Sequence, residues 1–464
     1  MENLKPDRVF YYFDKLMKIP RPSGHEKQVS DFLVATGKEL GLKTYQDESL
    51  NVIISRKASI GYEKAPKVTI QGHMDMVAAK EEGSDHDFTK DPLIPEISGK
   101  FLKAKGTSLG ADNGIAVAMG LALMEDKNYK GPSLELLVTT EEETSMAGAL
   151  NLGENILEGN YLINIDSEEE GVLTVGSAGG LTIFVDEEIG KQEENFGYQI
   201  KVSGLLGGHS GMQINEPRGN AVKILEELLD GFDLSIGEFY SGSLDNVIPS
   251  EGRVKVFGID IGDLEKRKME ILDKHQNLLG QLKIEIVEAK GLSYSKDLSR
   301  RLIKLIKNLP TGVNSFMENG YTVESSNNLA FIKDKGGRIL CEISLRSSNH
   351  YKLDDLTKKI TKVLEDNDFS YKIASRYPGW EYNKDSKLRP LAQKIYKQVS
   401  GKDFETIVIH AGLECGAIFE KYPNMDIISI GPDISGAHSI EEKVDVESVE
   451  RVYKYIKVLL ENIR

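Results

Sequence analysis

The hydrophobic positions of the first 180 residues group into short apolar runs separated by helical patterns. The Gly/Ala-rich segment at 114–124 is expected to be a helix, and a helical pattern over 7–39 is interrupted by Pro-Arg-Pro-Ser-Gly at 20–24. Four apolar runs have the length of strands: 50–55, 68–71, 134–139 and 161–165. Strands and helices that alternate with short connections predict an open α/β sheet covered by helices.

The pattern changes at about residue 181. Three strands are expected there with a helix between each pair, in the order 198–203, 220–229, 252–258, 264–279 and 283–288. A related series follows, with a helix, two strands joined by a turn at 334–337, a helix and a strand: 298–307, 328–333, 338–345, 353–364 and 371–375. Residues 181–376 are therefore predicted to form an inserted α+β region built from two diverged ferredoxin-like units.

After Tyr377-Pro-Gly-Trp380 the first pattern returns, with helices and strands at 391–399, 406–410, 425–429 and 446–463. We expect the outer segments, 1–180 and 377–464, to form one α/β domain with a mixed sheet flanked by helices. The region 181–376 interrupts this domain. In open sheets of this class, ligands collect at the carboxyl ends of the strands.

The charge balance argues against nucleic acid as a partner, because a formal net charge of -15 and a pI near 5.2 leave little basic surface for phosphates. The two cysteines, Cys341 and Cys415, form neither a disulfide framework nor a Cys-rich zinc module, which fits a reducing compartment. No apolar run approaches the roughly 18 residues of a membrane span. The segment 1–16 contains Glu2, Asp7 and Asp14 among its apolar residues, so it does not resemble a signal peptide. We expect a cytoplasmic protein without a membrane partner.

Imidazoles and carboxylates follow the predicted strands where these strands end. His73 and Asp75 come after the run at 68–71, and they face the same side because residues two apart on an extended chain point the same way. Glu141-Glu142-Glu143 follows the run at 134–139, and Asp166 ends the run at 161–165. A carboxylate beside an imidazole fixes the tautomer that binds a metal.

Two further candidates lie in glycine-containing segments. Asp112 stands in Ser108-Leu-Gly-Ala-Asp-Asn-Gly114, and His438 stands in a loop near the end of the chain. Each of the five segments that contain these candidates is, taken alone, more typical of a turn, a helix cap or a solvated surface. Together, two histidines and several carboxylates at the strand ends of one domain supply ligands for two divalent cations.

This ordered set of segments resembles the M20 family of metallopeptidases, and within it the branch that hydrolyses Xaa-His dipeptides. The resemblance extends along essentially the whole chain. It includes Pro20-Arg-Pro-Ser-Gly24 and, beyond the strand-end segments, Gly207-Gly-His-Ser-Gly211, Asn246-Val-Ile-Pro249, Tyr377-Pro-Gly-Trp380 and His410-Ala-Gly-Leu-Glu-Cys-Gly416.

The resemblance implies two zinc ions bridged by Asp112. His73 and Asp166 complete one site, and Glu143 and His438 complete the other. Mn²⁺ or Co²⁺ is expected to substitute for Zn²⁺, since affinity order and metal supply both affect which ion binds.

The resemblance also implies the catalytic roles. Asp75 holds His73, and Glu142 acts as general base on a metal-bridging water and returns the proton to the leaving amine. Ser145 stands where the family often has Gly, so the register within Glu141-Glu142-Glu143 stays open. Counting back from Gly148-Ala149 favours Glu143 as ligand and Glu142 as base.

The resemblance makes the outer segments the catalytic domain and the insert a lid domain. In the lid, His209 is the group that steadies the developing oxyanion and Asn246 contacts the substrate, and Gly412 of the outer segment 377–464 is a further substrate contact. Arg346 ends a predicted strand whose alternation places Cys341 in the core and Arg346 on the polar face with Glu342 and Ser344. A lone arginine at a strand end is usually a surface residue, but here it is expected to hold a substrate carboxylate.

The expected activity is hydrolysis of dipeptides, Xaa-His and broader, by a monomer or a homodimer. Two alternatives stay open. One is another M20 activity, such as a tripeptide aminopeptidase or an N-acyl amino acid amidohydrolase, and the other is a metal-bound peptide-binding protein without catalysis. The presence of both Glu142 and Asp75 argues against the latter, because binding alone requires neither.

Overall fold

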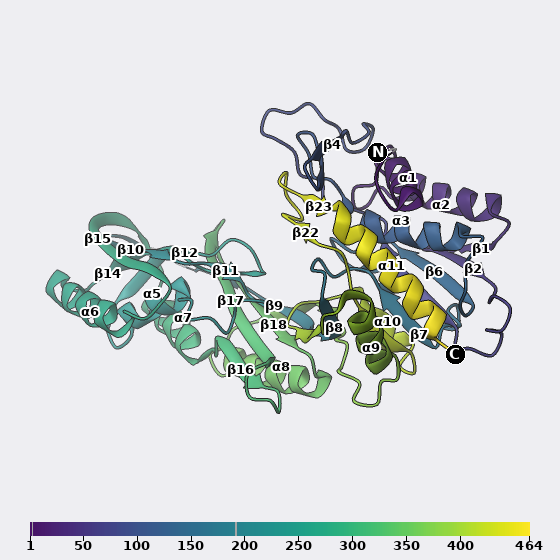
Figure 1. Cartoon of the computed structure of the whole chain (residues 1–464). Helices are drawn as coiled ribbons and strands as arrows, with labels where there is room; N and C mark the ends of the chain where they lie inside the picture. The colour runs from purple at the N-terminus through teal and green to yellow at the C-terminus, as the bar shows by residue number, and fades with distance from the viewer. Residues whose placement is uncertain (2, 191–192) are drawn as a thin grey trace. The chain divides into compact units, whose positions relative to one another are not determined.

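The computed structural model describes residues 1, 3–190 and 193–464, which divide into two compact units (Figure 1). Unit 1 comprises Met1–Ser177, Trp380–Val408 and Leu413–Arg464, and unit 2 comprises Ala178–Gly379 and Ile409–Gly412. Each unit has its own hydrophobic core. The division concerns packing and not activity, so the catalytic and lid roles expected of the two parts stay predictions.

Unit 1 is built around an eight-stranded sheet in the order β1-β2-β6-β3-β7-β21-β8-β20. Its centre is parallel: β3 (Val68–His73) pairs with β6 (Leu134–Thr139) and β7 (Tyr161–Asn164), and β7 pairs with β21 (Asp426–Ser429). Every residue of β3 and β6 is buried, as expected for parallel strands covered on both faces. The other strands are β1 (Lys43–Gln46), β2 (Val52–Arg56), β8 (Val172–Ser177) and β20 (Glu405–Ile409).

Alternation along the strands sends side chains into two separate clusters, one on each face of the sheet. Val52 and Ile54 of β2 belong to the cluster that also contains residues of α1 (Asp7–Leu16), α2 (Lys27–Glu39), α3 (Ala111–Glu125), α9 (Leu388–Ser400) and α11 (Val446–Asn462). Ile53 belongs to the cluster that contains residues of α4 (Ala147–Leu150) and α10 (Glu414–Lys421) and Trp380. A Cβ on Gly120 of α3 would lie 2.3 Å from Leu136 Cδ1, so the small residues of α3 permit close packing on β6.

The predicted fold class is confirmed, and the four apolar runs of the first 180 residues form β2, β3, β6 and β7. The sequence analysis missed β1 and β8. It also missed a four-stranded sheet in the order β22-β23-β5-β4: β22 (Ile434–Ser435), β23 (Lys443–Asp445), β5 (Phe101–Ala104) and β4 (Pro95–Ser98). These strands are short and partly exposed, so they carry little hydrophobic signal.

Unit 2 contains a nine-stranded sheet in the order β15-β10-β14-β12-β17-β18-β9-β19, with β16 paired to β17. Each half has the strand order of a ferredoxin-like unit, in which the first strand lies between the fourth and the third. One half runs β10, α5, β12, β14, α6, β15, and the other runs β9, α7, β17, β18, α8, β19. The first half is therefore inserted between β9 and α7 of the second.

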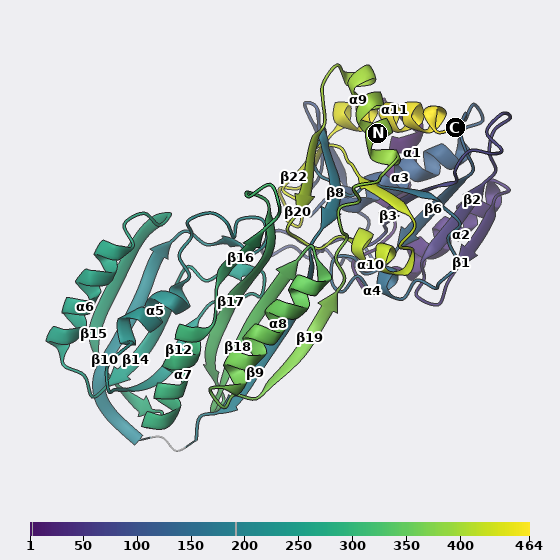
Figure 2. The ribbon, with the colours of Figure 1, turned by 90° about the horizontal axis from the view of Figure 1, so that it is seen from below.

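The helices of unit 2 share one hydrophobic cluster with the buried side of this sheet (Figure 2). They are α5 (Ala221–Leu229), α6 (Ile261–Lys274), α7 (Lys296–Asn308) and α8 (His350–Glu365). The strands are β9 (Gly179–Glu188), β10 (Glu193–Leu205), β12 (Ser235–Ser241), β14 (Gly252–Phe257), β15 (Gly280–Ser293), β16 (Gly312–Phe316), β17 (Val323–Lys335), β18 (Arg338–Ser347) and β19 (Tyr371–Tyr377).

The predicted series for this region was incomplete. It lacked β12 and β16, and it began the second unit at the helix 298–307, whereas that unit begins with β9. The predicted helix 264–279 ends at Lys274 because the chain turns there and enters β15 at Gly280. In the part of the chain that the structure describes, no helix is long and apolar enough to cross a membrane.

Candidate active site

The carboxyl ends of the parallel strands form one edge of the unit 1 sheet, and each leads to a candidate residue. β3 ends at His73, and Asp166 follows β7 by two positions. Glu143 lies in the turn after β6, and His438 lies in the segment after β22. Asp112 lies in the first turn of α3, where its φ of -76° and ψ of 106° are not helical.

Asp112 has one carboxylate oxygen towards each imidazole. Its Oδ1 lies 3.3 Å from His73 Nε2, and its Oδ2 lies 3.1 Å from His438 Nε2. Asp166 Oδ1 is 3.4 Å from His73 Nε2, and Glu143 Oε2 is 2.9 Å from His438 Nε2. The five residues therefore form two groups of three that share Asp112.

These residues fit divalent cations. Two donors about 2.1 Å from a tetrahedral ion lie roughly 3.4 Å apart, which is close to the four separations between imidazole nitrogens and carboxylate oxygens given above. One ligand atom each from His73, Asp112 and Glu143 lie within 4.8 Å of one another. Among the described residues, Glu143 Oε1 and Asp166 Oδ1 are buried without a hydrogen-bond partner, and such atoms are costly unless a ligand satisfies them.

The electrostatics of the cluster also favour cations. Burial alone would lower the pKa of His73, but Asp166, Asp112 and Asp75 together raise it well above its ordinary value. Hydrogen bonds that the protonated ring of His438 donates to Asp112 and Glu143 raise the pKa of His438 to about 11. An excess of carboxylates that holds protons on imidazoles attracts a metal ion in the same way.

Asp75 is fully buried and connects His73 with the turn after β6. Its Oδ1 lies 3.4 Å from His73 Nδ1 and accepts the backbone N–H of Glu142 at 3.1 Å. Its Oδ2 accepts the hydroxyl of Ser23 at 2.8 Å and the backbone N–H of Glu143 at 3.2 Å. One carboxylate thus orients an imidazole and the backbone of two candidate residues.

The chain turns at Glu141, whose φ is 53°. Its side chain accepts the hydroxyl of Ser145, and its backbone N–H donates to Glu26 Oε1. Glu142 Oε2 lies 3.8 Å from His73 Nε2. Burial, and then Asp166 among the nearby acids, raises the pKa of Glu142 well above its ordinary value. A carboxylate with a raised pKa in such a cluster suits proton transfer near neutral pH.

Several residues of this site were missed by the sequence analysis. Glu414 is fully buried, and its Oε2 accepts hydrogen bonds from Thr139 Oγ1 at 2.6 Å and Gln71 Nε2 at 2.7 Å. Burial raises the pKa of Glu414 to about 8, and burial with Asp112 and Asp166 nearby raises that of Glu168 to about 7. Arg21 and Glu442 were missed as well. Glu414 lies in the segment 410–416, which resembles the M20 family, but nothing in the neighbouring sequence distinguishes it from a surface glutamate.

In unit 2, β11 (Gly208–His209) pairs with β13 (Val247–Ile248), which brings the two predicted glycine- and asparagine-containing segments together. His209 Nδ1 accepts the backbone N–H groups of Gly211 and Met212, so its proton resides on Nε2. Burial and then the charge of Arg346 lower the pKa of His209, which keeps the ring neutral. The carbonyl of Asn246 accepts the N–H of Ser210 at 2.8 Å.

Arg346 lies near the end of β18, where its Nη1 donates to the hydroxyl of Tyr377 at 2.8 Å. His410 shares a hydrogen bond with Ser326 through Nε2, and burial with Arg346 and His209 nearby lowers its pKa to about 3. Gly412 follows two positions later. Arg346, His209 and His410 therefore belong to one polar cluster of unit 2.

The expected alternation along β18 is confirmed. Cys341 is fully buried in the core, as predicted. Glu342 and Ser344 lie outside that apolar cluster, on the opposite side of the strand, and each is less than a tenth exposed, so this side is covered as well. Ser344 Oγ donates to the carbonyl of Asp245, which shows that the loop before β13 covers it.

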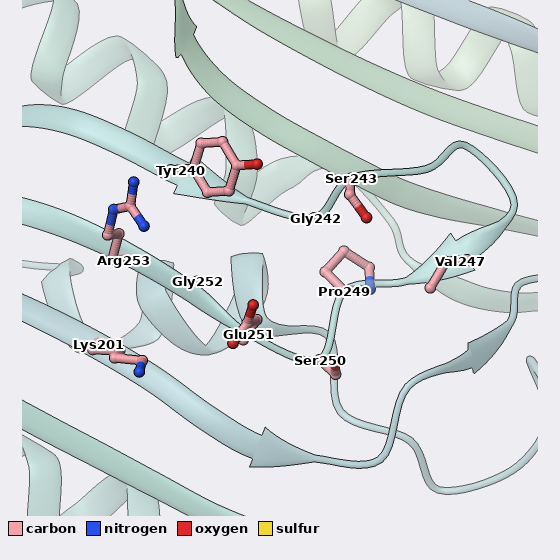
Figure 3. Close-up of a pocket in the computed structure, with 10 residues that line it drawn as sticks. All are labelled: Lys201, Tyr240, Gly242, Ser243, Val247, Pro249, Ser250, Glu251, Gly252 and Arg253. Carbon is pink, nitrogen blue, oxygen red and sulfur yellow. The ribbon is translucent and has the colours of Figure 1, made fainter. Parts of the chain in front are cut away.

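The loop before β13 also lines a cavity of about 290 Å³ in unit 2 (Figure 3). Tyr240 and Ser243 line one side, Val247 and Pro249 lie at one end, and Lys201, Arg253 and Glu251 supply charges. Because the charged groups have both signs, the lining does not select one charge of ligand. The candidate chemistry is therefore carried by the cluster of unit 1.

Comparison with known proteins identifies the family. The sequence profile of Peptidase family M20/M25/M40 matches residues 69–462. The chain belongs to this family. The predicted resemblance to M20 is confirmed, and so is the prediction of an enzyme that hydrolyses peptide bonds.

Individual relatives cover the whole chain. It is 35% identical over 483 residues to the cytosol non-specific dipeptidase of Escherichia coli (strain K12), covering 100% of this chain and 99% of that protein. The crystal structure of aminoacylhistidine dipeptidase from Vibrio alginolyticus matches with a TM-score of 0.88 and 33% identity over 100% of this chain and 98% of that chain. Aminopeptidase PepT from Bacillus cereus, with a TM-score of 0.59 and 14% identity over 99% of each chain, shares the fold.

Proposed function

We propose that this M20 peptidase is a dipeptidase that uses two divalent cations. The observation that carries the proposal is the placement of Asp112, whose two oxygens lie 3.3 Å and 3.1 Å from different imidazoles. Two further supports are the full-length similarity to proteins named as dipeptidases and the buried carboxylate oxygens without partners.

His73, Asp112 and Asp166 are proposed to hold one cation, and Asp112, Glu143 and His438 the other. Zn²⁺ suits this mixture of imidazole and carboxylate ligands, and Mn²⁺ or Co²⁺ can replace it. When bound, two cations polarise the scissile carbonyl and lower the pKa of water.

The protein's own residues are proposed to move the proton and orient the substrate. Glu142 accepts a proton from the attacking water and donates it to the leaving amine. Asp75 keeps His73 and the turn around Glu142 in place. His209, with its proton on Nε2, donates to the oxygen that becomes negative as the carbonyl is attacked, a contact that stabilises the transition state more than the substrate.

The proposed substrate class rests on further residues of unit 2. Arg346 is proposed to bind the free carboxylate of the substrate, with Asn246 and Gly412 as further contacts, which sets a short distance between carboxylate and scissile bond. Dipeptides, Xaa-His and broader, are therefore the proposed substrates. Unit 1 acts as the catalytic domain and unit 2 as the lid. The cytoplasm is the proposed location, and a monomer or homodimer stays the expected assembly.

Hydrolysis across a panel tests the proposal. Dipeptides including several Xaa-His, tripeptides and N-acyl amino acids are offered to the protein after chelator treatment and after reconstitution with Zn²⁺, Mn²⁺ or Co²⁺. We expect turnover only with metal, with dipeptides favoured. Preference for tripeptides or acyl amino acids would assign another activity of the family, and no turnover in any arm would leave a peptide-binding protein.

A further inference from the structure

A buried carboxylate holds the turn that carries Asp112. Glu442 is 2% exposed, and its Oε2 accepts the backbone N–H groups of Leu109 at 2.8 Å and Gly110 at 2.9 Å. Its Oε1 accepts those of Ala111 at 2.8 Å and Asp112 at 3.2 Å. Four consecutive amides at the start of α3 thus depend on one side chain. Glu442 lies four positions after His438, so it connects the segments of two candidate ligands.

A buried cation holds the same turn from the other side. Arg21 is 2% exposed, and its Nη2 donates to the carbonyl of Gly110. Its Nη1 donates to the carbonyls of Met74 at 2.9 Å and Asp75 at 3.1 Å. The backbone of Gly110 is therefore held between Glu442 at its N–H and Arg21 at its C=O. The same guanidinium fixes the segment that follows His73.

The glycines of the Asp112 segment make room for this arrangement. A Cβ on Gly110 would lie 2.5 Å from Arg21 Nη2, and a Cβ on Gly114 would lie 2.6 Å from it. Gly110 also has a φ of 66°, which favours glycine. The spacing of these glycines around Asp112 therefore reflects the guanidinium as well as the turn.

We propose that Arg21 and Glu442 are positioning residues that set the geometry of the cation ligands His73, Asp112 and His438. This inference rests on the proposed function. Charge-assisted hydrogen bonds to backbone groups are stronger than neutral ones, and the two opposite charges offset part of each other's burial cost. Loss of groups that orient ligands lowers metal affinity by about 10- to 100-fold.

The plainer explanation is that Glu442 only stabilises the start of α3, as carboxylates at helix N-termini do. That role requires no Arg21 and leaves the affinity for cations unchanged. The test must therefore read metal binding directly, apart from both stability and activity.

The experiment compares full-length wild type with Glu442→Gln and Arg21→Lys, and with Glu441→Gln as the matched exposed control. Gln keeps the size of Glu442 but offers one acceptor oxygen in place of two. Lys keeps the charge of Arg21 but lacks the fork that reaches both Gly110 and the Met74–Asp75 carbonyls. Zn²⁺ affinity is measured by competition with a chelating dye, Co²⁺ coordination by visible absorption, and folding by circular dichroism.

We expect Glu442→Gln and Arg21→Lys to fold, to bind Zn²⁺ about 10- to 100-fold more weakly and to show an altered Co²⁺ spectrum. Glu441→Gln should match wild type. Unchanged affinity and spectrum in both variants would overturn the proposal, as would failure of both to fold with and without metal, because the residues would then serve folding alone. Failure of wild type to bind metal would instead contradict the proposed function.

Discussion

The backbone N–H of Glu142 donates a hydrogen bond to Oδ1 of Asp75, at 3.1 Å. The same oxygen lies 3.4 Å from the ring nitrogen of His73 that faces away from Asp112. A single buried carboxylate therefore sets both an imidazole that is proposed to bind a cation and the turn that carries the proposed general base. The two functions are coupled through one side chain.

Asp75→Asn should reduce both metal affinity and kcat. The amide offers one acceptor oxygen and places N–H donors against either His73 or the N–H groups of the turn, so His73 and Glu142 cannot both be held. We expect metal affinity to fall about 10- to 100-fold. Ser23→Ala, which removes one hydrogen bond to Asp75, serves as the milder control. Competition with a chelating dye and dipeptide turnover read both effects, and wild-type affinity in Asp75→Asn would contradict the coupling.

The ends of the central strands could be predicted because their signal is local. β3, β6 and β7 are short apolar runs buried on both faces, and His73, the Glu141–Glu143 segment and Asp166 follow them directly. Parallel strands bring their carboxyl ends to one edge, so nearness of these groups follows from the fold class. The roles of the individual residues stay predictions.

Other parts had no local signal. β9 lies beside β18 and β19, although the whole inserted ferredoxin-like half separates β9 from both strands in sequence, and no periodicity indicates that pairing. Arg21 and Glu442 are single charged residues of types that are mostly exposed. Their burial follows from long-range hydrogen bonds to the turn before Asp112, which only the folded chain brings together.

Arg346→Ala should lower kcat/KM for dipeptides by more than tenfold, mainly through KM. A bidentate charged contact contributes about 1.5–3 kcal/mol, and its loss removes the anchor for the substrate carboxylate. Tyr377→Phe removes only the hydroxyl that accepts from Arg346, so a smaller rise in KM is expected. Arg338→Ala, on the same strand but paired with Asp186 at the surface, is the matched control. Steady-state kinetics with dipeptides and blocked dipeptides decide the matter, and wild-type efficiency in Arg346→Ala would assign the arginine another role.

Acid should destabilise the protein partly through His410. Its pKa is about 3 in the folded state and 6.5 ordinarily, so the unfolded chain binds the extra proton between these values and stability falls as the pH drops below 6.5. At pH 5 this difference between the folded and unfolded pKa of His410 lowers the free energy of unfolding by about 2 kcal/mol. Urea unfolding at pH 7.5 and pH 5 should therefore show a smaller pH-dependent loss in His410→Gln than in wild type. Equal losses in the two proteins would rule His410 out as a source of acid sensitivity.

His209 is expected to act on the substrate bound by its own chain. Unit 2 consists of two related ferredoxin-like halves, so one chain already contains the pair of units that two subunits with single-unit lids would otherwise provide together. Inactive His209→Ala and Glu142→Ala chains are unfolded together and refolded as a mixture, with co-refolded wild type as the control for recovery. We expect no activity in the mixture. Activity that returns only in the mixture would show that His209 works in trans.

The register within Glu141-Glu142-Glu143 gives the sharpest test of the site. Glu143 Oε2 lies 2.9 Å from His438 Nε2, whereas Glu141 turns away at a φ of 53° and accepts a hydroxyl from Ser145. Glu142→Gln keeps shape but cannot accept a proton, so kcat should fall about 10²–10⁴-fold with metal content unchanged.

Glu143→Ala removes a proposed ligand, so one of the two metals should be lost or bound much more weakly. Glu141→Gln should leave both turnover and metal content near wild type. Among the described residues, the hydrogen-bond partner of the Glu141 carboxylate is Ser145, which is not a proposed ligand. Elemental analysis of the three variants, together with dipeptide turnover, separates the base from the ligand. Metal loss in Glu142→Gln with full metal content in Glu143→Ala would shift the register by one position and make Glu141 the base.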